Sequence, residues 1–312
     1  MSFSAFHNIL NNRADEERET PADLDEQNGG IDGESEIGAA DSIPDDLSAD
    51  RNLFRDFPHG AAVGNMVHKL LETCAGHFDV FRTEDRDDPA DSEPVQLRIA
   101  GVLREFGCDS EDETMRRQLL DGISRALRIP LPEMSDGCGP GISLSELDQK
   151  RMVPEMEFFL NAPASLDIQS ILSILAESAS DQARPLVSRE NVSFDKKGIL
   201  NGIIDLVFEH GGKYYIVDWK TNWLGDSDAD YTSDRIRLAM KNAGYVLQSY
   251  LYTVALVCIL SQRGLSYDSF GGVYYLFLRG LKQETRNGIW FDKPPQECIA
   301  GLLNLFFHGQ GK

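Results

Sequence analysis

Two β-rich runs separated by a pair of glycines constrain the fold of this chain most strongly. Residues 199 to 209 and 213 to 219 are rich in β-branched and aromatic side chains, and Gly211-Gly212 lies between them. A two-residue hairpin turn needs positive φ at its central positions, which glycine adopts without steric cost. We therefore predict an antiparallel hairpin in which residues equidistant from this turn face one another.

The hairpin brings two aspartates and a lysine to one place. Asp205 and Asp218 are equidistant from the turn, and opposed residues have Cβ atoms about 4.5 to 5.5 Å apart on one face. Lys220 follows Asp218 by two residues and therefore shares its face. Two facing carboxylates repel each other unless a cation lies between them. Mg²⁺ suits this position because it favours oxygen ligands and retains water, which it activates as a nucleophile.

The alternative for an Asp-x-Lys pattern on a strand is a surface ion pair. Asp205, however, lies among apolar neighbours in residues 202 to 207. A carboxylate in such surroundings is costly unless it is paired or binds metal. The pattern therefore favours metal-dependent attack on phosphorus, with Lys220 offsetting negative charge on the phosphate. From carboxylate repulsion alone, we expect Asp218→Ala to abolish cleavage at little cost in stability.

Charge is distributed unevenly along the 312 residues. The formal net charge is -21, but residues 181 to 312 contain roughly as many basic as acidic side chains. Residues 1 to 50 are acidic and poor in large apolar residues, which is typical of a disordered linker or tail. We expect one domain over residues 51 to 312, with a helical part (51 to 150) and a catalytic core (151 to 312) whose charge permits DNA binding.

Hydrophobic periodicity and turn residues predict the remaining elements. Helices are expected at residues 61–75, 95–105, 113–127, 165–177 (with a serine cap), 233–261 (broken near Gly244) and after Pro294-Pro295, and strands at 154–160 and 272–278. The order predicts an α/β fold, a mixed central sheet with helices on both faces. The apolar run at residues 250 to 260 is too short for a membrane span, and the N-terminus lacks a signal-peptide pattern, so we expect a cytoplasmic protein without a membrane partner. Five scattered cysteines predict free thiols rather than a disulfide framework, zinc site or iron–sulfur cluster.

Several motifs together resemble the RecB-family nucleases of the PD-(D/E)XK superfamily. The hairpin segment GIIDLVFEHGGKYYIVDWKTNWLG (202–225) resembles the nuclease motif, and FPHGAAVGNMVHKLLE (57–72) the N-terminal helix of that family. Further resemblances are MVPEMEFFL (152–160), YVLQSYLY (245–252), FGGVYYLFLRGL (270–281) and NGIWF (287–291). The resemblance covers about residues 54 to 307 and implies a PD-(D/E)XK restriction-endonuclease-like core.

The resemblance also implies roles for individual residues. Asp205 and Asp218 would be catalytic metal ligands, Lys220 the catalytic lysine, and His68 a further ligand in place of an ordinary core histidine. The additional acid would be Glu155, with Glu157 as the alternative. Gln248, Tyr252 and Tyr245 would contact DNA or support the site; alternatively, the tyrosines fill the core and Gln248 caps a carbonyl.

The implied function is Mg²⁺-dependent hydrolysis of DNA phosphodiesters. Exonuclease action is the first expectation and endonuclease action on single strands the second, in double-strand break repair and recombination. The implied partners are single- and double-stranded DNA, RecC-like and RecD-like subunits and a RecA-like recombinase. The chain has no P-loop motif for an ATP motor, so it corresponds either to part of a helicase–nuclease or to a stand-alone relative. A catalytically inactive DNA-binding or scaffold module is the main alternative, and an iron–sulfur nuclease of the Cas4 or AddB type is the second.

Overall fold

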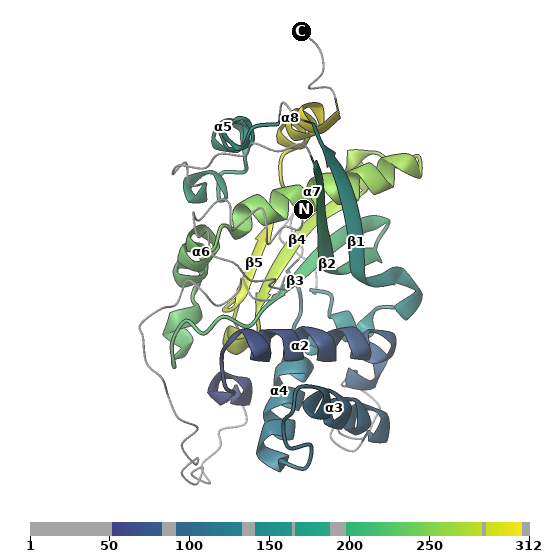
Figure 1. The fold of residues 1–312 in the computed structure, drawn as a ribbon, viewed down its shortest axis with the longest axis vertical. Helices are drawn as coiled ribbons and strands as arrows, with labels where there is room; N and C mark the ends of the chain where they lie inside the picture. Colours follow the sequence, from purple (N-terminus) through teal and green to yellow (C-terminus); the bar gives the residue numbers. More distant parts are fainter. Residues whose placement is uncertain are drawn as a thin grey trace.

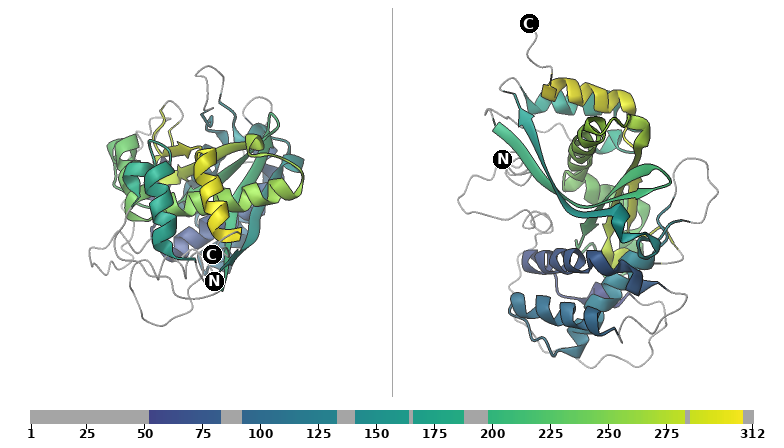
Figure 2. Two further views of the ribbon diagram at one scale, coloured as in Figure 1. Left: turned by 90° about the horizontal axis from the view of Figure 1, so that it is seen from above. Right: turned by 90° about the vertical axis from the view of Figure 1, so that its right-hand side faces the viewer.

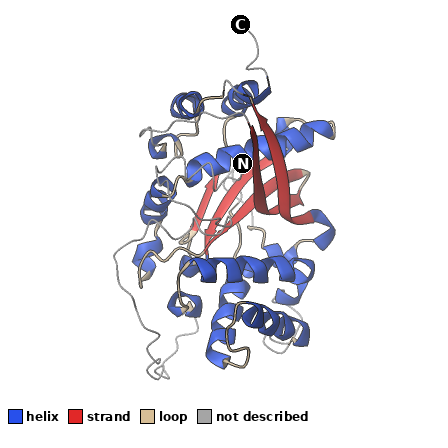
Figure 3. Cartoon of the chain, in the orientation of Figure 1, coloured by secondary structure: helices blue, strands red, loops and turns tan. Residues whose placement is uncertain are grey.

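The computed structural model describes residues 52–82, 92–132, 141–163, 166–187, 198–282 and 285–307. The predicted tail at residues 1 to 50 lies outside these residues. The first half of the described chain is helical, as Figures 1 and 3 show. Its elements are η2 (Leu53–Asp56), α2 (Ala61–Cys74), η3 (Ala75–Phe81), α3 (Glu93–Glu105), α4 (Glu113–Arg128), η5 (Leu144–Glu146) and η6 (Gln149–Arg151).

The sheet and the helices that cover it make up the second half. They are β1 (Met152–Ala162), α5 (Ile168–Ser178), η7 (Arg184–Leu186), β2 (Gly198–His210), β3 (Lys213–Lys220), η8 (Asp228–Tyr231), α6 (Ser233–Asn242), α7 (Tyr245–Gln262), η9 (Tyr267–Ser269), β4 (Phe270–Phe277), η10 (Leu278–Gly280), β5 (Ile289–Asp292) and α8 (Gln296–Phe307). The strands form one sheet in the order β1-β2-β3-β4-β5. Only β3 and β4 are parallel, so the predicted mixed α/β sheet is confirmed.

The β2–β3 hairpin has the predicted turn. Gly211 and Gly212 have φ values of 58° and 78°, in the left-handed region that glycine favours. His210 pairs with Lys213, and the register continues without a shift to Leu206 and Val217. The period-2 alternation of both strands is therefore fixed from the turn to the position of the two aspartates.

The sheet separates two apolar cores. Ile216 and Tyr275 point into the first core, with α5, α7 and α8, whereas Val217 and Tyr274 point into the second, with α2, α3 and α4. The two sets of helices lie on different sides of the sheet in Figures 1 and 2, as predicted. Because residues of the helical part and of the sheet share the second core, α2 is held against the sheet by packing on its buried face.

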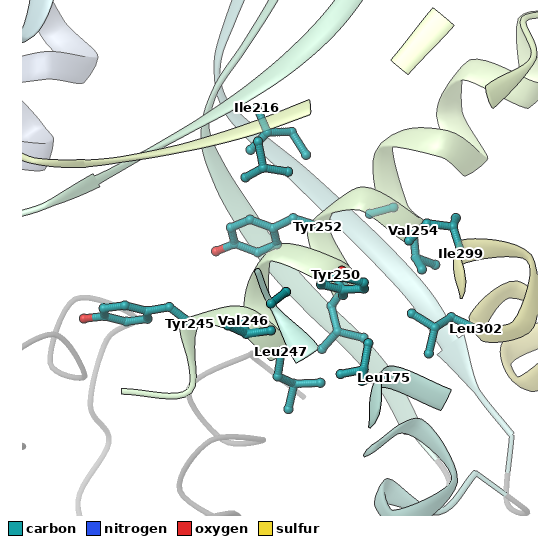
Figure 4. Close-up of a cluster of buried hydrophobic side chains, with 14 of the residues drawn as sticks. Leu175, Ile216, Tyr245, Val246, Leu247, Tyr250, Tyr252, Val254, Ile299 and Leu302 are labelled. Carbon is teal, nitrogen blue, oxygen red and sulfur yellow. The ribbon is translucent and has the colours of Figure 1, made fainter. Parts of the chain in front are cut away.

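Helix α7 is the centre of the first core. Its 18 residues are long and apolar enough to cross a membrane, but 78% of them are buried inside the protein, as in the core helix of a globular protein. Figure 4 shows Tyr250 and Val254 of α7 in one cluster with Leu175 of α5 and Leu302 of α8. The predicted break before α7 is confirmed: Gly244 adopts φ 70° and separates α6 from α7.

Several element boundaries differ from the prediction by one to three residues, and two of them have a clear local cause. Helix α5 begins at Ile168, where the side chain of Asp167 accepts a hydrogen bond from the Gln169 N–H. Ser165, the predicted cap, lies outside the described residues. Strand β4 begins at Phe270 rather than residue 272 and ends at Phe277, because Phe270 already pairs with β3 before the register shift between Tyr214 and Tyr215.

A fully buried arginine joins the N-terminal segment to the end of β3. The Arg279 guanidinium donates to the carbonyls of Thr221 (2.7 Å), Phe57 (2.6 Å) and Pro58 (2.6 Å), and also to those of Phe54 and Arg55. Phe57 and Pro58 lead into α2, while Thr221 directly follows β3. Arg279 therefore fixes the start of α2 relative to the end of β3.

Substitution of Arg279 tests this connection. Arg279→Met should lower the free energy of unfolding by about 3 kcal/mol or more, because several buried carbonyls lose their donor and each costs about 1 to 3 kcal/mol. The matched control is Arg263→Met at the exposed end of α7, which should change it by less than about 0.5 kcal/mol. Urea unfolding measures both, and equal stability of the two variants would show that Arg279 does not connect these segments.

Candidate active site

The hairpin brings Asp205 and Asp218 to neighbouring positions on β2 and β3, in the register that the turn predicts. The pairing of the two strands ends at Leu206 and Val217, and the two aspartates are the next residues on each strand. Asp205 Oδ2 accepts a hydrogen bond of 2.8 Å from the Trp219 N–H. Trp219 itself is 2% exposed and packs in the second core, on the opposite face of β3 from Asp218.

Strand β1 adds a third carboxylate at the same level. Pro154 pairs with Leu206 and Met156 with Ile204, so Glu155 lies level with Asp205. Burial, followed by the neighbouring Asp205 charge, raises the pKa of Glu155 to about 7, while His68 opposes the shift. Three acidic residues thus form a row of neighbouring positions across β1, β2 and β3.

The backbone at Glu155 distinguishes the two candidate glutamates. Glu155 has φ 46° and is the one non-glycine residue with positive φ in the described part of the chain. Such a conformation costs about 1 to 3 kcal/mol and persists where the surroundings enforce it. Beyond it, Phe158 packs in the first core although Met152 packs in the second, so the strand changes its facing here. Glu157 is exposed, and the geometry favours Glu155.

Helix α2 brings His68 to the row of carboxylates. His68 Nδ1 lies 3.4 Å from Asp205 Oδ1. The helix approaches closely because Gly64, one turn earlier, faces the end of β3: a Cβ at Gly64 would lie 3.3 Å from Thr221 Oγ1. Glu72, one turn after His68, accepts a hydrogen bond from Lys69 at 2.9 Å. Because its imidazole lies against the Asp205 carboxylate, His68 is not an ordinary core histidine.

Asp205 remains ionised in these surroundings. Burial alone would raise its pKa, but the charge and hydrogen bond of His68, the Lys220 charge and the Trp219 N–H together outweigh burial and lower the pKa. The site therefore contains at least one carboxylate held negative by its neighbours. Such an oxygen is a suitable ligand for a hard cation.

Lys220 and Asp218 form a buried ion pair. The distance from Lys220 Nζ to Asp218 Oδ2 is 2.8 Å, and the side chains are 4% and 2% exposed. The ammonium also lies over the Tyr245 ring, 4.1 Å from its centroid. This geometry corrects the expectation that Asp218 could be removed at little cost, because the variant would leave the lysine charge buried without that carboxylate.

The α7 side chains support the site from beneath. Gln248 Nε2 donates to Tyr252 Oη at 3.0 Å, and Tyr275 Oη donates to Gln248 Oε1 at 2.9 Å. Tyr245 Oη donates to Asn222 Oδ1 at 3.2 Å. In Figure 4 the Tyr245 and Tyr252 rings extend to the same side of α7. Tyr245, Gln248 and Tyr252 are buried, so the geometry favours a role in supporting the site over direct contact with DNA. Gln248 binds two tyrosine hydroxyls rather than a backbone carbonyl.

Tyr275 was not predicted as a site residue. It pairs with Asp218 across the parallel β3–β4 ladder, and burial, followed by the Asp218 charge, raises its pKa well above the ordinary value. Burial and the same charge raise the pKa of Tyr252. Both phenols are thus protonated donors near Asp218. No local signal in the sequence gives the register between β3 and the distant β4.

The donor set matches a hard divalent cation in chemistry. Glu155, Asp205 and Asp218 supply carboxylates and His68 an imidazole, and repulsion within the row would be relieved by a positive ion. As the side chains stand, no three His, Cys, Asp or Glu residues in the described ranges converge closely enough to hold an ion together. Mg²⁺ does not require such a cage, because one or two carboxylates, water and substrate phosphate complete its coordination.

Comparisons with known proteins agree with the motifs. No protein-family model matches the chain. The RecBCD enzyme subunit RecB of Haemophilus influenzae is 32% identical over 265 residues, covering 83% of this chain and 20% of that subunit. RecB of Escherichia coli is 35% identical over 254 residues (80% and 19%), and RecB of Mycolicibacterium smegmatis 29% over 277 residues (80% and 24%).

The chain spans about one fifth of the length of the first two of these relatives. The matches nevertheless cover at least 80% of this chain, so the similarity is not limited to the hairpin motif. Over the segment that they share, this chain therefore belongs to the RecB family.

Proposed function

We propose that this chain is a Mg²⁺-dependent deoxyribonuclease domain that hydrolyses phosphodiester bonds in DNA. The observation that carries the proposal is the level row of Glu155, Asp205 and Asp218 on three neighbouring strands, with Lys220 Nζ 2.8 Å from Asp218. The carboxylates of this row would bind a metal ion, and the Lys220 ammonium is fixed beside them. Both positive charges would then face the phosphate of a substrate.

Asp205 and Asp218 would hold the ion, with Glu155 and His68 as further ligands. When bound, the metal polarises a phosphoryl oxygen and lowers the pKa of a bound water. Lys220, held over the Tyr245 ring, orients the attacking water and offsets the charge that builds on the phosphate. Gln248 links the hydroxyls of Tyr252 and Tyr275, and these side chains support the site on the side of the first core.

The cellular role follows from the relatives. These relatives are RecB subunits of RecBCD enzymes, so we propose that this chain acts as an exonuclease, and on single strands as an endonuclease, in cytoplasmic double-strand break repair and recombination. RecC-like and RecD-like subunits would guide DNA to it, which fits a chain of net charge -21 whose excess acid lies outside the catalytic core. A RecA-like protein would receive the product strand.

Cleavage of labelled linear DNA tests the reaction. The wild-type protein should cut with Mg²⁺ and not with EDTA, and Asp205→Asn or Lys220→Met should lower kcat by roughly 10²-fold or more, because each removes charge stabilisation of the transition state. Glu155→Gln should also be impaired. The matched control, Glu157→Gln on the same strand, should stay within about twofold of wild type.

Two outcomes would overturn this proposal in different ways. Equal cleavage by Asp205→Asn and wild type means that the site is misassigned. DNA binding by a wild-type protein that cuts no substrate with Mg²⁺ or Mn²⁺ favours the alternative of an inactive DNA-binding or scaffold module.

The buried ion pair predicts an unequal stability of the variants. In metal-free buffer, Asp218→Ala should lower the free energy of unfolding by about 3 kcal/mol or more, because the Lys220 ammonium loses its buried carboxylate. Adding Lys220→Met should restore part of this loss. Asp181→Ala, which breaks an exposed pair with Arg184, is the control and should cost less than about 1 kcal/mol. Additive effects of the two substitutions in urea unfolding would contradict the pairing.

A further inference from the structure

An exposed aromatic pair lies just beyond the end of β3. Trp223 stacks on His59 with ring centroids 5.8 Å apart and planes inclined by 20°. Trp223 is 46% exposed, and His59 is also on the surface. A large aromatic side chain in this position leaves apolar area in water that a flat ligand can cover.

The indole is held in a fixed position. Trp223 Nε1 donates to Asp226 Oδ1 at 3.2 Å, and the Arg55 guanidinium donates to the Asp226 carbonyl. On either side of Trp223, the Leu224 N–H donates to Tyr231 Oη and the side chain of Asn222 accepts from Tyr245. Because backbone and ring edge are both anchored, the exposed ring presents a preorganised flat surface.

Helix α2 relates this pair to the row of carboxylates. His59 directly precedes the helix, Gly64 faces Thr221, and His68 faces Asp205, so the three contacts follow one another along α2. From Gly60 to His68 the helix rises roughly 12 Å at 1.5 Å per residue. This corresponds to about three or four nucleotides of a stacked strand at roughly 3.4 Å each.

We propose that Trp223, backed by His59, is a stacking platform for one nucleobase of single-stranded DNA, three or four nucleotides from the bond that is cut. The assignment rests on the proposed nuclease function and adds a binding residue to it. Stacking on an aromatic ring accepts any base, since every base has a π-face, and it needs no basic surface. It therefore suits a chain whose acidic charge gives little general attraction for phosphate.

Intrinsic fluorescence reports on this stacking directly. The chain has three tryptophans, and Trp219 and Trp290 are buried at 2% and 4% exposure. With EDTA present to prevent cleavage, single-stranded oligothymidylate should quench the fluorescence of the wild type but not of Trp223→Phe, and a blunt duplex of equal length should quench little. Trp223→Ala should raise the Kd for the single strand about tenfold, and Trp223→Phe should restore most of the affinity.

The control is Phe159→Ala, the loss of an even more exposed aromatic side chain on β1, which should leave the Kd unchanged. With Mg²⁺, Trp223→Ala should raise KM about tenfold while kcat stays within about threefold, because the ring does not touch the reacting phosphate. An abasic nucleotide moved along the substrate should weaken wild-type binding most at one position, three or four nucleotides from the cut, and should have no such effect in Trp223→Ala.

Failure of this inference is distinguishable from failure of the nuclease proposal. If Trp223→Ala binds and cuts like wild type, or if Trp223→Phe is quenched as strongly as wild type, the platform is wrong while the nuclease assignment stands. If wild-type fluorescence is unaffected by single-stranded DNA that the protein does cut, the exposed pair serves another surface, such as a protein partner, and the platform is again wrong.

Discussion

Repulsion among three carboxylates at one level of the sheet is the constraint on which this structure depends. Glu155, Asp205 and Asp218 lie on adjacent strands, where their negative charges oppose one another. His68 contacts Asp205, and Lys220 forms an ion pair with Asp218. Burial first, and the Asp205 charge second, raise the pKa of Glu155 to about 7, so the protein alone does not stabilise a negative charge on this third carboxyl. A divalent cation would supply the missing positive charge.

The surrounding fold serves to hold these groups in register. The second core fixes α2 and with it His68, while Arg279 connects the approach to α2 with the residue after Lys220. From the other side of the sheet, α7 places Tyr245 against the lysine. Each charged group thus belongs to an element whose position is set by apolar packing rather than by the charges themselves. Apolar packing in the two cores therefore offsets the repulsion between the grouped like charges.

Local sequence signals predicted the parts of the site that depend on short-range geometry. Gly211-Gly212 determines the hairpin register, which aligns Asp205 with Asp218, and the 3.6-residue period placed His68 on a buried helix. The preference for Glu155 over Glu157 came from the family resemblance, and local signals could not give it, because no local pattern predicts the positive φ at Glu155. Tyr275 was missed because a parallel ladder joins strands far apart in the chain. The burial of the Asp218–Lys220 pair was not predicted, because alternation gives the face of a side chain but not its burial.

Diffraction from crystals soaked in MnCl₂ would show directly whether this row of carboxylates binds a divalent ion, since Mn²⁺ shares the oxygen ligands of Mg²⁺ and scatters anomalously. An anomalous peak should lie about 2.0 to 2.3 Å from carboxylate oxygens of Asp205 and Asp218. The peak should disappear in Asp205→Asn. A protein that cuts DNA in the same buffer but has its Mn²⁺ peak elsewhere, or has no peak, would contradict the account.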